Sequence, residues 1–334
     1  MNNSGIKLYC LFLLYCLACL FPGCSDSNGS GGSGGSTSEI AIMITGDLES
    51  RIVPEEVSRD GETLVLGGLA RIAAAAEEIR NTVDGSLLLS AGNDVLGSFY
   101  YMFEGEPEMQ GITMAGYDVV TPGTHEFDYG SAVYGHALGF ADFDVVSANL
   151  EINDETVSDR MLPYVVKTVA GIRIGIFGLT APDFALLCNP TGGGVQVDPD
   201  IIAIAERLMA QIPLNGCDVV IALTHMGLSW ARELAQKVDG IDIIIDGYDR
   251  TPLYETVNNT LIIQEGSGGE YLSVLNFNFQ NGALRNPSWK RILMDEQVGS
   301  DPQIQELMAS YQSAYEQGLS QVIGESRVDR TFPW

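Results

Sequence analysis

The feature that most constrains the fold is a series of short apolar runs, rich in valine and isoleucine, that recurs from residue 39 onward. Most of these runs do not alternate with polar residues, which is typical of strands buried on both faces of a sheet. We expect strands at EIAIMIT (39–45), SLLLSA (86–91), DVVT (118–121), DVVSANL (144–150), GIRIGIFGLT (171–180), DVVIALTH (218–225), IDIIID (241–246), NTLIIQEG (259–266) and YLSVLNFNF (271–279).

Helical stretches separate several of these strands. Apolar residues recur at helical spacing in 67–83, and residues 200–211 and 229–238 are further candidates. A last helix is expected from about residue 301, with Asp301 or Ser300 as its N-cap and Pro302 in its first turn. The sequence contains no internal repeat, and the mixture of strands and helices predicts a layered α/β domain.

Charge limits the classes of partner. The 334 residues include 17 basic and 44 acidic side chains, for a formal charge of −27. Such a balance argues against non-specific binding to nucleic acid or to an anionic membrane, because basic residues cannot dominate a large surface. A small anionic ligand, such as a phosphate ester, stays compatible with the composition because a few local cations can hold it.

The N-terminal segment is expected to be a targeting signal. Lys7 precedes the apolar run LYCLFLLYCLACLF (8–21), which is shorter than the about 20 apolar residues of a membrane-spanning helix. Cys24 follows it, and a Ser/Gly tract comes next, a pattern that resembles a bacterial lipoprotein leader. We predict a signal peptide over 1–24 and a flexible linker over 25–38, with export to the cell envelope and lipidation of Cys24. Cleavage at Cys19, or a signal peptide without a lipid, are the alternatives.

Cysteine usage leaves one question open. If Cys24 carries the lipid, Cys188 and Cys217 are the two thiols outside the leader. They form either one disulfide in an oxidising compartment or two buried thiols. Their spacing is not of a metal-binding type.

Polar residues follow the predicted strands at the points where the strands end. In α/β sheets, ligands bind at the carboxyl ends of the strands, so these side chains are expected to share one site. They are Asp47, Asn93, Thr124 with His125, Asn149, His225 and the segment 246–251.

Several motifs occur in a fixed order: GDLESRIVP, GGLARIA, SAGNDVLGS, AGYDVVTPGTHEFDYG, VVSANL, GIRIGIFGLT, DVVIALTHMG and GIDIIIDGYDRT. In this order they resemble the 5′-nucleotidase branch of the calcineurin-like metallophosphatases, over about residues 40–285. The resemblance implies a four-layer αββα sandwich, expected here as a single domain over 39–296. A C-terminal helix and tail would occupy 297–334, and the second nucleotidase domain, which recognises the base, is expected to be absent.

The resemblance also implies roles for the strand-end residues. The family holds two divalent cations that activate water for attack on a phosphate ester. Asp47 and His225 match metal-binding positions, and His125 and Asp128 match the pair that assists the leaving group. Asn149 and Arg250 are expected to bind substrate. At the other metal positions the sequence departs from the family, with Glu49, Asn93, Thr124, Tyr248 and Arg250 as the substitutions.

These substitutions predict the loss of the two-metal centre. A neutral amide at Asn93 is a poor bridge between cations, and Arg250 has no lone pair to donate and adds a positive charge. Two states then fit the residues. A single hard ion (magnesium, manganese or calcium) could be held by Asp47, Glu49 and the Asn93 carbonyl, with Asp94 or Asp249. Alternatively the site is metal-free, and the Arg250 guanidinium pairs with Asp47 and Glu49.

The function predicted from these residues is a 5′-nucleotidase-like domain that retains the ligand cleft but is a weak or inactive phosphohydrolase. The alternative is an active single-metal phosphoesterase that hydrolyses nucleotides or other small phosphate esters. His125 and Asp128 would then steady the leaving group, whereas in an inactive site they are structural. A small phosphate ester is the expected ligand and nucleic acid is not, whereas the sequence leaves a protein partner open. The membrane is expected to be contacted only through the N-terminal lipid.

Overall fold

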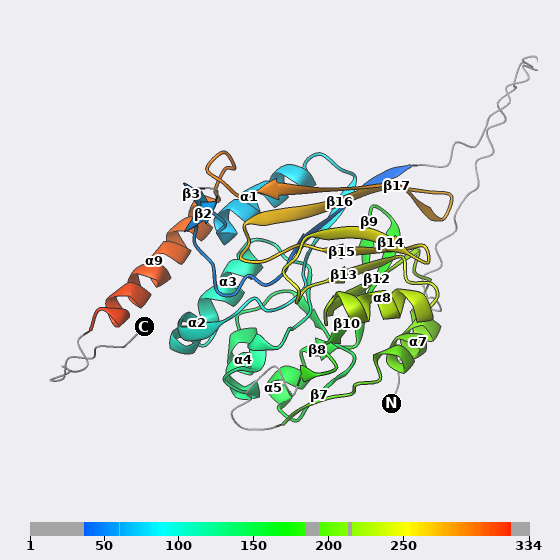
Figure 1. Ribbon diagram of the computed structural model, residues 1–334, viewed down its shortest axis with the longest axis horizontal. Coiled ribbons are helices and arrows are strands. Elements are labelled where there is room, and N and C mark those ends of the chain that lie inside the picture. Colours follow the sequence, from blue (N-terminus) through cyan, green and yellow to red (C-terminus); the bar gives the residue numbers. More distant parts are fainter. Residues whose placement is uncertain (1–36, 60, 185–193, 213–215, 322–334) are drawn as a thin grey trace, which may run out of the picture. The chain divides into compact units, whose positions relative to one another are not determined.

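The structure is a computed structural model that describes residues 37–59, 61–184, 194–212 and 216–321 (Figure 1). The predicted signal peptide, Cys24, most of the linker and Cys188 lie outside these residues. The described residues belong to one compact unit that begins at Ser36. Within these ranges, no helix combines the length and the apolar character needed to cross a bilayer.

Two mixed sheets form the centre of the domain. The first sheet has the order β17-β16-β1-β4-β5-β6-β8 and the second has β14-β15-β13-β12-β10-β9. The strands of the first sheet are β1 (Ser38–Thr45), β4 (Gly85–Ser90), β5 (Val119–Val120), β6 (Asp144–Val146), β8 (Met161–Leu162), β16 (Tyr271–Gln280) and β17 (Ala283–Leu293). Those of the second are β9 (Tyr164–Val169), β10 (Ile172–Thr180), β12 (Val219–His225), β13 (Ile243–Asp246), β14 (Leu253–Val257) and β15 (Thr260–Gln264).

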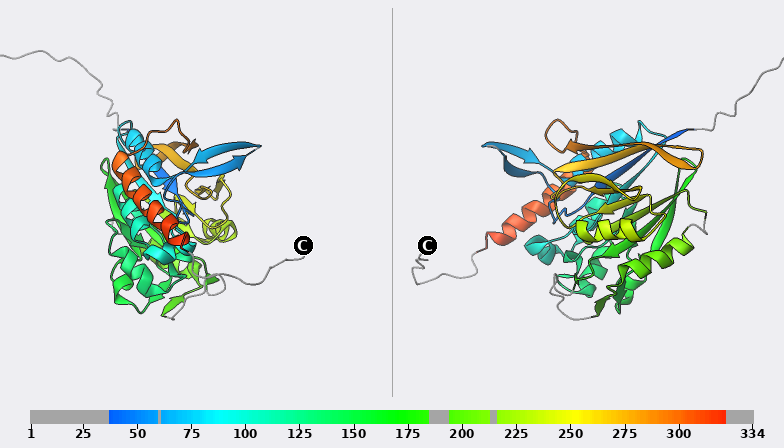
Figure 2. Two further views of the ribbon diagram at one scale, coloured as in Figure 1. Left: turned by 90° about the vertical axis from the view of Figure 1, so that its left-hand side faces the viewer. Right: turned by 45° about the vertical axis from the view of Figure 1, so that its right-hand side comes forward.

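Helices cover the outer face of each sheet. The helices are α1 (Leu69–Arg80), α2 (Gly97–Phe103), α3 (Glu106–Met114), α4 (Ser131–Leu138), α5 (Glu155–Ser158), α7 (Ile201–Gln211), α8 (Leu228–Lys237) and α9 (Pro302–Leu319), with a 3-10 turn over His125–Phe127. Helices α1, α3 and α4 pack on the first sheet, α9 packs against α1 and α3, and α7 and α8 pack on the second sheet. In Figure 2, α9 lies alongside α1 and α3.

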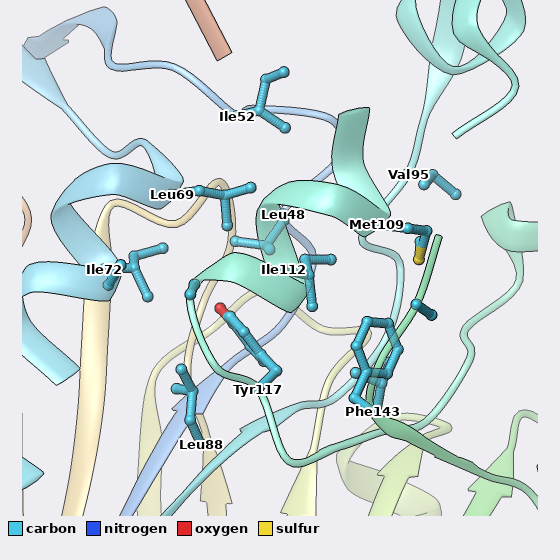
Figure 3. Packing of buried hydrophobic residues seen from close by; sticks show 14 of the residues in the cluster. Leu48, Ile52, Leu69, Ile72, Leu88, Val95, Met109, Ile112, Tyr117 and Phe143 are labelled. Carbon is cyan, nitrogen blue, oxygen red and sulfur yellow. The ribbon is translucent and has the colours of Figure 1, made fainter. Parts of the chain in front are cut away.

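Side-chain direction along the strands explains the continuous apolar runs. In β1, Ile40, Ile42 and Ile44 enter the core between the two sheets, whereas Ala41 and Met43 enter the core beneath the helices. Figure 3 shows part of this second core, where Leu48, Leu69 and Ile112 converge. Strand β12 divides its residues in the same way between the inter-sheet core and the core under α7 and α8. Because both faces of each sheet are covered, the predicted four-layer αββα sandwich is confirmed.

Aspartates fix the amino ends of several parallel strands. Asp84 accepts the backbone N–H of Glu39, and Asp118, Asp218 and Asp242 accept those of Leu88, Arg173 and Val220 at the starts of neighbouring strands. Each carboxylate thereby satisfies a donor that the sheet ladder leaves unpaired. These links lie at the ends of the strands opposite to the loops that carry the predicted site.

Most predicted elements are confirmed, and one strand differs. The predicted N-cap Asp301 accepts the N–H groups of Gln303 and Ile304 at the start of α9. The predicted strand 144–150 ends at Val146, and Leu150–Ile152 (β7) pairs instead with Val195–Val197 (β11). The hairpin of β2 (Glu55–Arg59) and β3 (Glu62–Leu66) was not predicted, because its polar residues give no apolar run.

Candidate functional site

The predicted site lies in the loops that follow β1, β4, β5, β12 and β13. Backbone conformation marks these loops, because six residues that are not glycine have a positive φ: Asp47 (47°), Glu49 (54°), Ser50 (60°), Asn93 (55°), Tyr248 (85°) and Arg250 (54°). Such angles are uncommon outside glycine and persist only where the surrounding contacts enforce them. Their concentration here indicates a backbone shaped to present side chains to one place.

Arg250 forms ion pairs with two acidic residues of the first loop. Its Nε lies 3.7 Å from Asp47 Oδ1, and its Nη2 contacts Glu49 Oε1. The side chains of Asp47 and Glu49 are 0% and 7% exposed, whereas that of Arg250 is 47% exposed. Burial raises the pKa of Glu49, and the charge of Arg250 opposes this shift. The pairing predicted for the metal-free state is therefore present.

Asn93 uses its side chain to connect two loops. Its Oδ1 accepts the backbone N–H groups of Thr124 (2.9 Å) and His125 (3.0 Å), and its Nδ2 donates to Asp47 Oδ1 (3.2 Å). The amide carbonyl thus faces backbone donors, and the amide nitrogen faces the carboxylate. The prediction that the Asn93 carbonyl serves as a metal ligand is not supported by this orientation, because the oxygen already accepts two hydrogen bonds.

The other carboxylates of the predicted single-ion set are also engaged. Asp94 accepts the Ser90 hydroxyl at 2.7 and 2.8 Å, and burial raises the pKa of Asp94 to about 7. Asp249 accepts the Leu228 N–H (2.6 Å) and a Gln264 amide N–H (3.1 Å). Among the described residues, no three His, Cys, Asp or Glu side chains are grouped so that they could hold a metal ion. The donor set in this arrangement does not fit the family's metal pair.

His125 and Asp128 lie together on the 3-10 turn after β5. His125 Nδ1 is 2.8 Å from Asp128 Oδ2, and both side chains are about one quarter exposed. This hydrogen bond raises the pKa of His125. Because Asp128 engages Nδ1, Nε2 is the ring nitrogen left for a ligand. The two residues predicted to act as a pair are therefore in contact, while their catalytic role stays a prediction.

Glu126, which the sequence did not single out, holds the loop of His125 in place. It is 1% exposed, and its carboxylate accepts the N–H groups of Asp94 (2.9 Å) and Gly123 (2.8 Å). Glu126 accepts from the loop after β4, and Asn93 in that loop accepts from the loop after β5. Each of the two loops therefore holds the other. Burial raises the pKa of Glu126 to about 8. No sequence signal distinguished this buried acid from a solvated one.

His225 is fully buried at the end of β12. Its Nδ1 is 2.6 Å from the Ala91 carbonyl oxygen, which can only accept, so Nδ1 carries the proton. Burial lowers its pKa, which keeps the ring neutral with a lone pair on Nε2. That nitrogen is buried and has no hydrogen-bond partner among the described residues. The ring of Tyr248 lies edge-on at 5.8 Å between centroids. The predicted role of His225 as a metal ligand stays a prediction.

Asn149, predicted to bind substrate, occupies a structural position. It is 1% exposed, its Oδ1 accepts from Thr180 N–H (2.8 Å), and its Nδ2 donates to the Thr180 carbonyl (2.7 Å). Further hydrogen bonds involve Ser147 and the Asp198 carbonyl. All of its hydrogen-bonding groups are thereby used, and they tie the end of β6 to the end of β10. In this arrangement Asn149 has no free group for a ligand.

Comparisons with known proteins agree with the fold. The chain is 27% identical over 320 residues to a snake venom 5′-nucleotidase of Gloydius brevicauda, covering 87% of the chain and 54% of that protein. The structure of a 5′-nucleotidase precursor from Thermus thermophilus matches 87% of the chain and 61% of its own length, at 25% identity and a TM-score of 0.78. The phosphoesterase YfkN of Bacillus subtilis is matched over its full chain and 86% of this one, at 21% identity and a TM-score of 0.71. No family model matches.

The αββα sandwich with its site at the strand ends defines a domain of the calcineurin-like metallophosphatase class. Within that class the chain is similar to 5′-nucleotidases, with 26–27% identity over 87% of the chain to the relatives from Gloydius brevicauda and Bos taurus. The chain spans about half the length of the curated relatives that it matches.

Proposed function

We propose that this domain is an exported member of the family that binds a small phosphate ester, such as a nucleoside monophosphate, without two-metal hydrolysis. The observation that carries the proposal is the contact of the Arg250 guanidinium with Asp47 and Glu49. These two side chains are the carboxylates that a cation at this position would need.

Electrostatics supports the loss of the metal pair. Two dications about 4 Å apart repel by roughly 15–20 kcal/mol at an effective dielectric constant of about 20, so a bridging anion is needed to hold them. Asn93 supplies a neutral amide whose oxygen already accepts two backbone N–H groups. Arg250 adds a cation and no lone pair. The site is therefore suited to the single guanidinium of Arg250 and not to two divalent metal ions.

The groups that remain favour an anion. A guanidinium has five N–H donors. The Arg250 side chain is nearly half exposed, so some of its N–H donors stay available to a ligand after it pairs with Asp47 and Glu49. His125 has a raised pKa, and its Nε2 is the ring nitrogen that Asp128 does not engage. Both can donate to phosphate oxygens, and Asp128 fixes the ring that does so. The names of the relatives, 5′-nucleotidases, support a nucleotide as the ligand.

Thermal unfolding in the presence of a chelator tests this function. Adenosine monophosphate should raise the melting temperature of the wild-type domain with EDTA present, and the increase should be lost in His125→Ala. His136→Ala is the matched control, because His136 is half exposed on α4 and its ion-pair partner is Glu104, which is not one of the site residues. Absence of any shift with adenosine monophosphate or inorganic phosphate in the wild type would refute binding.

A single-metal phosphoesterase is the second candidate, and it is favoured by the His225 Nε2, which has no partner within the described part of the chain. A buried imidazole whose other nitrogen donates to a carbonyl has the arrangement common among metal-binding histidines. Release of phosphate from adenosine monophosphate with manganese added, abolished in both His125→Ala and His225→Ala, would establish this function in place of the first.

A further inference from the structure

The carboxylates of the site are far more buried than the cation beside them. Asp47 and Glu49 have side chains 0% and 7% exposed, against 47% for Arg250. Buried carboxylates that lack a cation or sufficient donors are strongly destabilising. We propose that Arg250 is the built-in cation of this carboxylate pair, and that a divalent ion can bind Asp47 and Glu49 only when the guanidinium is removed. The inference rests on the proposed function in one respect, that the site does not hold its own metal pair.

The donors around Asp47 engage both oxygens of its carboxylate. Oδ1 accepts from Asn93 Nδ2 and pairs with Arg250, and Oδ2 accepts the Tyr248 backbone N–H at 3.1 Å. Two of these three groups come from the same loop, in which Tyr248 and Arg250 both have left-handed backbones. The loop after β13 therefore delivers a backbone donor and a guanidinium to one carboxylate.

Glu49 depends on Arg250 more strongly than Asp47 does. Its Oε1 is buried and meets Arg250 as an ion pair without a well-directed hydrogen bond. The charge of Asp47 acts on Glu49 in the unfavourable direction, and the charge that opposes it most is that of Arg250. Loss of the guanidinium would leave two like charges together. The remaining compensation would be the neutral donors on Asp47 and the charges of Arg51 and His125, whose effects on Glu49 are smaller than that of Arg250.

A divalent ion has the chemistry to replace the guanidinium. Magnesium and manganese are commonly held by one or two carboxylates with water completing the coordination shell. The half-exposed position of Arg250 gives water access to the same place. Arg250→Met removes the charge and keeps an unbranched side chain, so it opens this position with little loss of packing.

A surface ion pair provides a matched control. Arg232 pairs with Glu255, and both side chains are more than a quarter exposed. Arg232→Met makes the chain more acidic by the same single charge as Arg250→Met. Any non-specific uptake of cations by this acidic chain is then equal in the two variants, and their difference reports on the site.

Manganese binding, followed by the loss of the electron paramagnetic resonance signal of the free ion, tests the proposal. We expect Arg250→Met to bind one manganese ion per chain more than Arg232→Met or the wild type. We also expect its melting temperature to fall by about 5 °C in EDTA and to recover with millimolar manganese, whereas Arg232→Met changes little. Equal manganese binding by the wild type and Arg250→Met would overturn the proposal, as would an Arg250→Met melting curve that matches the wild type in EDTA.

A second variant keeps the test decisive if Arg250→Met does not fold. Arg250→Lys retains the charge on a flexible stem, and we expect it to fold and to bind no more manganese than the wild type. Stoichiometric binding by Arg250→Lys would show that charge at this position does not exclude the ion. Binding of adenosine monophosphate is measured separately in EDTA, so failure of the proposed function leaves the manganese result intact.

Discussion

Asn93→Asp converts the amide that connects the site's loops into a third carboxylate. In the wild type, Asn93 Nδ2 donates to Asp47 Oδ1 across 3.2 Å, and the two side chains are almost fully buried. The substitution replaces this attraction by the repulsion of two carboxylates at about the same distance. With an effective dielectric constant of about 20, the repulsion is about 5 kcal/mol.

The measured loss should be smaller than this repulsion. The introduced carboxyl can take up a proton, which limits the cost near neutral pH, and Arg250 offsets part of the charge. We therefore expect the free energy of unfolding to fall by about 2–4 kcal/mol in EDTA near neutral pH. The loss should shrink as the pH is lowered, because protonation removes the repulsion. Manganese should not restore the stability, because Arg250 still occupies the carboxylates of Asp47 and Glu49.

Urea unfolding with and without manganese measures these effects. Asn149→Asp is the matched control, because Asn149 is equally buried but has Thr180 backbone groups as its partners. That variant should lose stability and gain nothing from manganese. The reasoning is refuted if Asn93→Asp is as stable as the wild type in EDTA, or if manganese stabilises Asn93→Asp while Arg250 is in place.

Two further predictions concern the buried acids and the contact between the sheets. Burial raises the pKa values of Asp94 and Glu126 to about 7 and about 8, so the folded state binds more protons than the unfolded state between about pH 4 and pH 8. Stability should therefore fall as the pH rises through that window. Urea unfolding should show a smaller total fall across the window for Glu126→Gln than for the wild type, by on the order of 5 kcal/mol. Gly178→Ala would place a Cβ 2.0 Å from the Val146 carbonyl oxygen, where β10 meets β6. It should cost about 3 kcal/mol or more in the same assay, whereas Gly299→Ala, whose Cβ meets only Ala74 at 3.9 Å, should change little.

The layers could be predicted from the sequence because a strand that is buried on both faces has an apolar residue at nearly every position of the run. Residues 40–44 are all apolar, and their alternate side chains enter different cores. The pairing of Arg250 with Asp47 and Glu49 was also predictable, because carboxylates that share a buried site are strongly destabilising unless a cation pairs with them.

The orientation of side chains within the loops could not be predicted in the same way. The direction of the Asn93 amide is set by the N–H groups of Thr124 and His125, some thirty residues later in the chain. Asn149 was predicted to bind a ligand because it follows a strand, but the Thr180 backbone takes up its amide. A polar residue at a strand end has either role, and only the contacts of the folded loops distinguish them.

Elemental analysis of the protein purified without chelators, from cells grown with manganese and zinc, decides whether the site works with a guanidinium or with metal ions. We expect well below one divalent ion per chain, because Arg250 occupies the carboxylates and Asn93 supplies no bridge. Two tightly held ions per chain would contradict this view of the site.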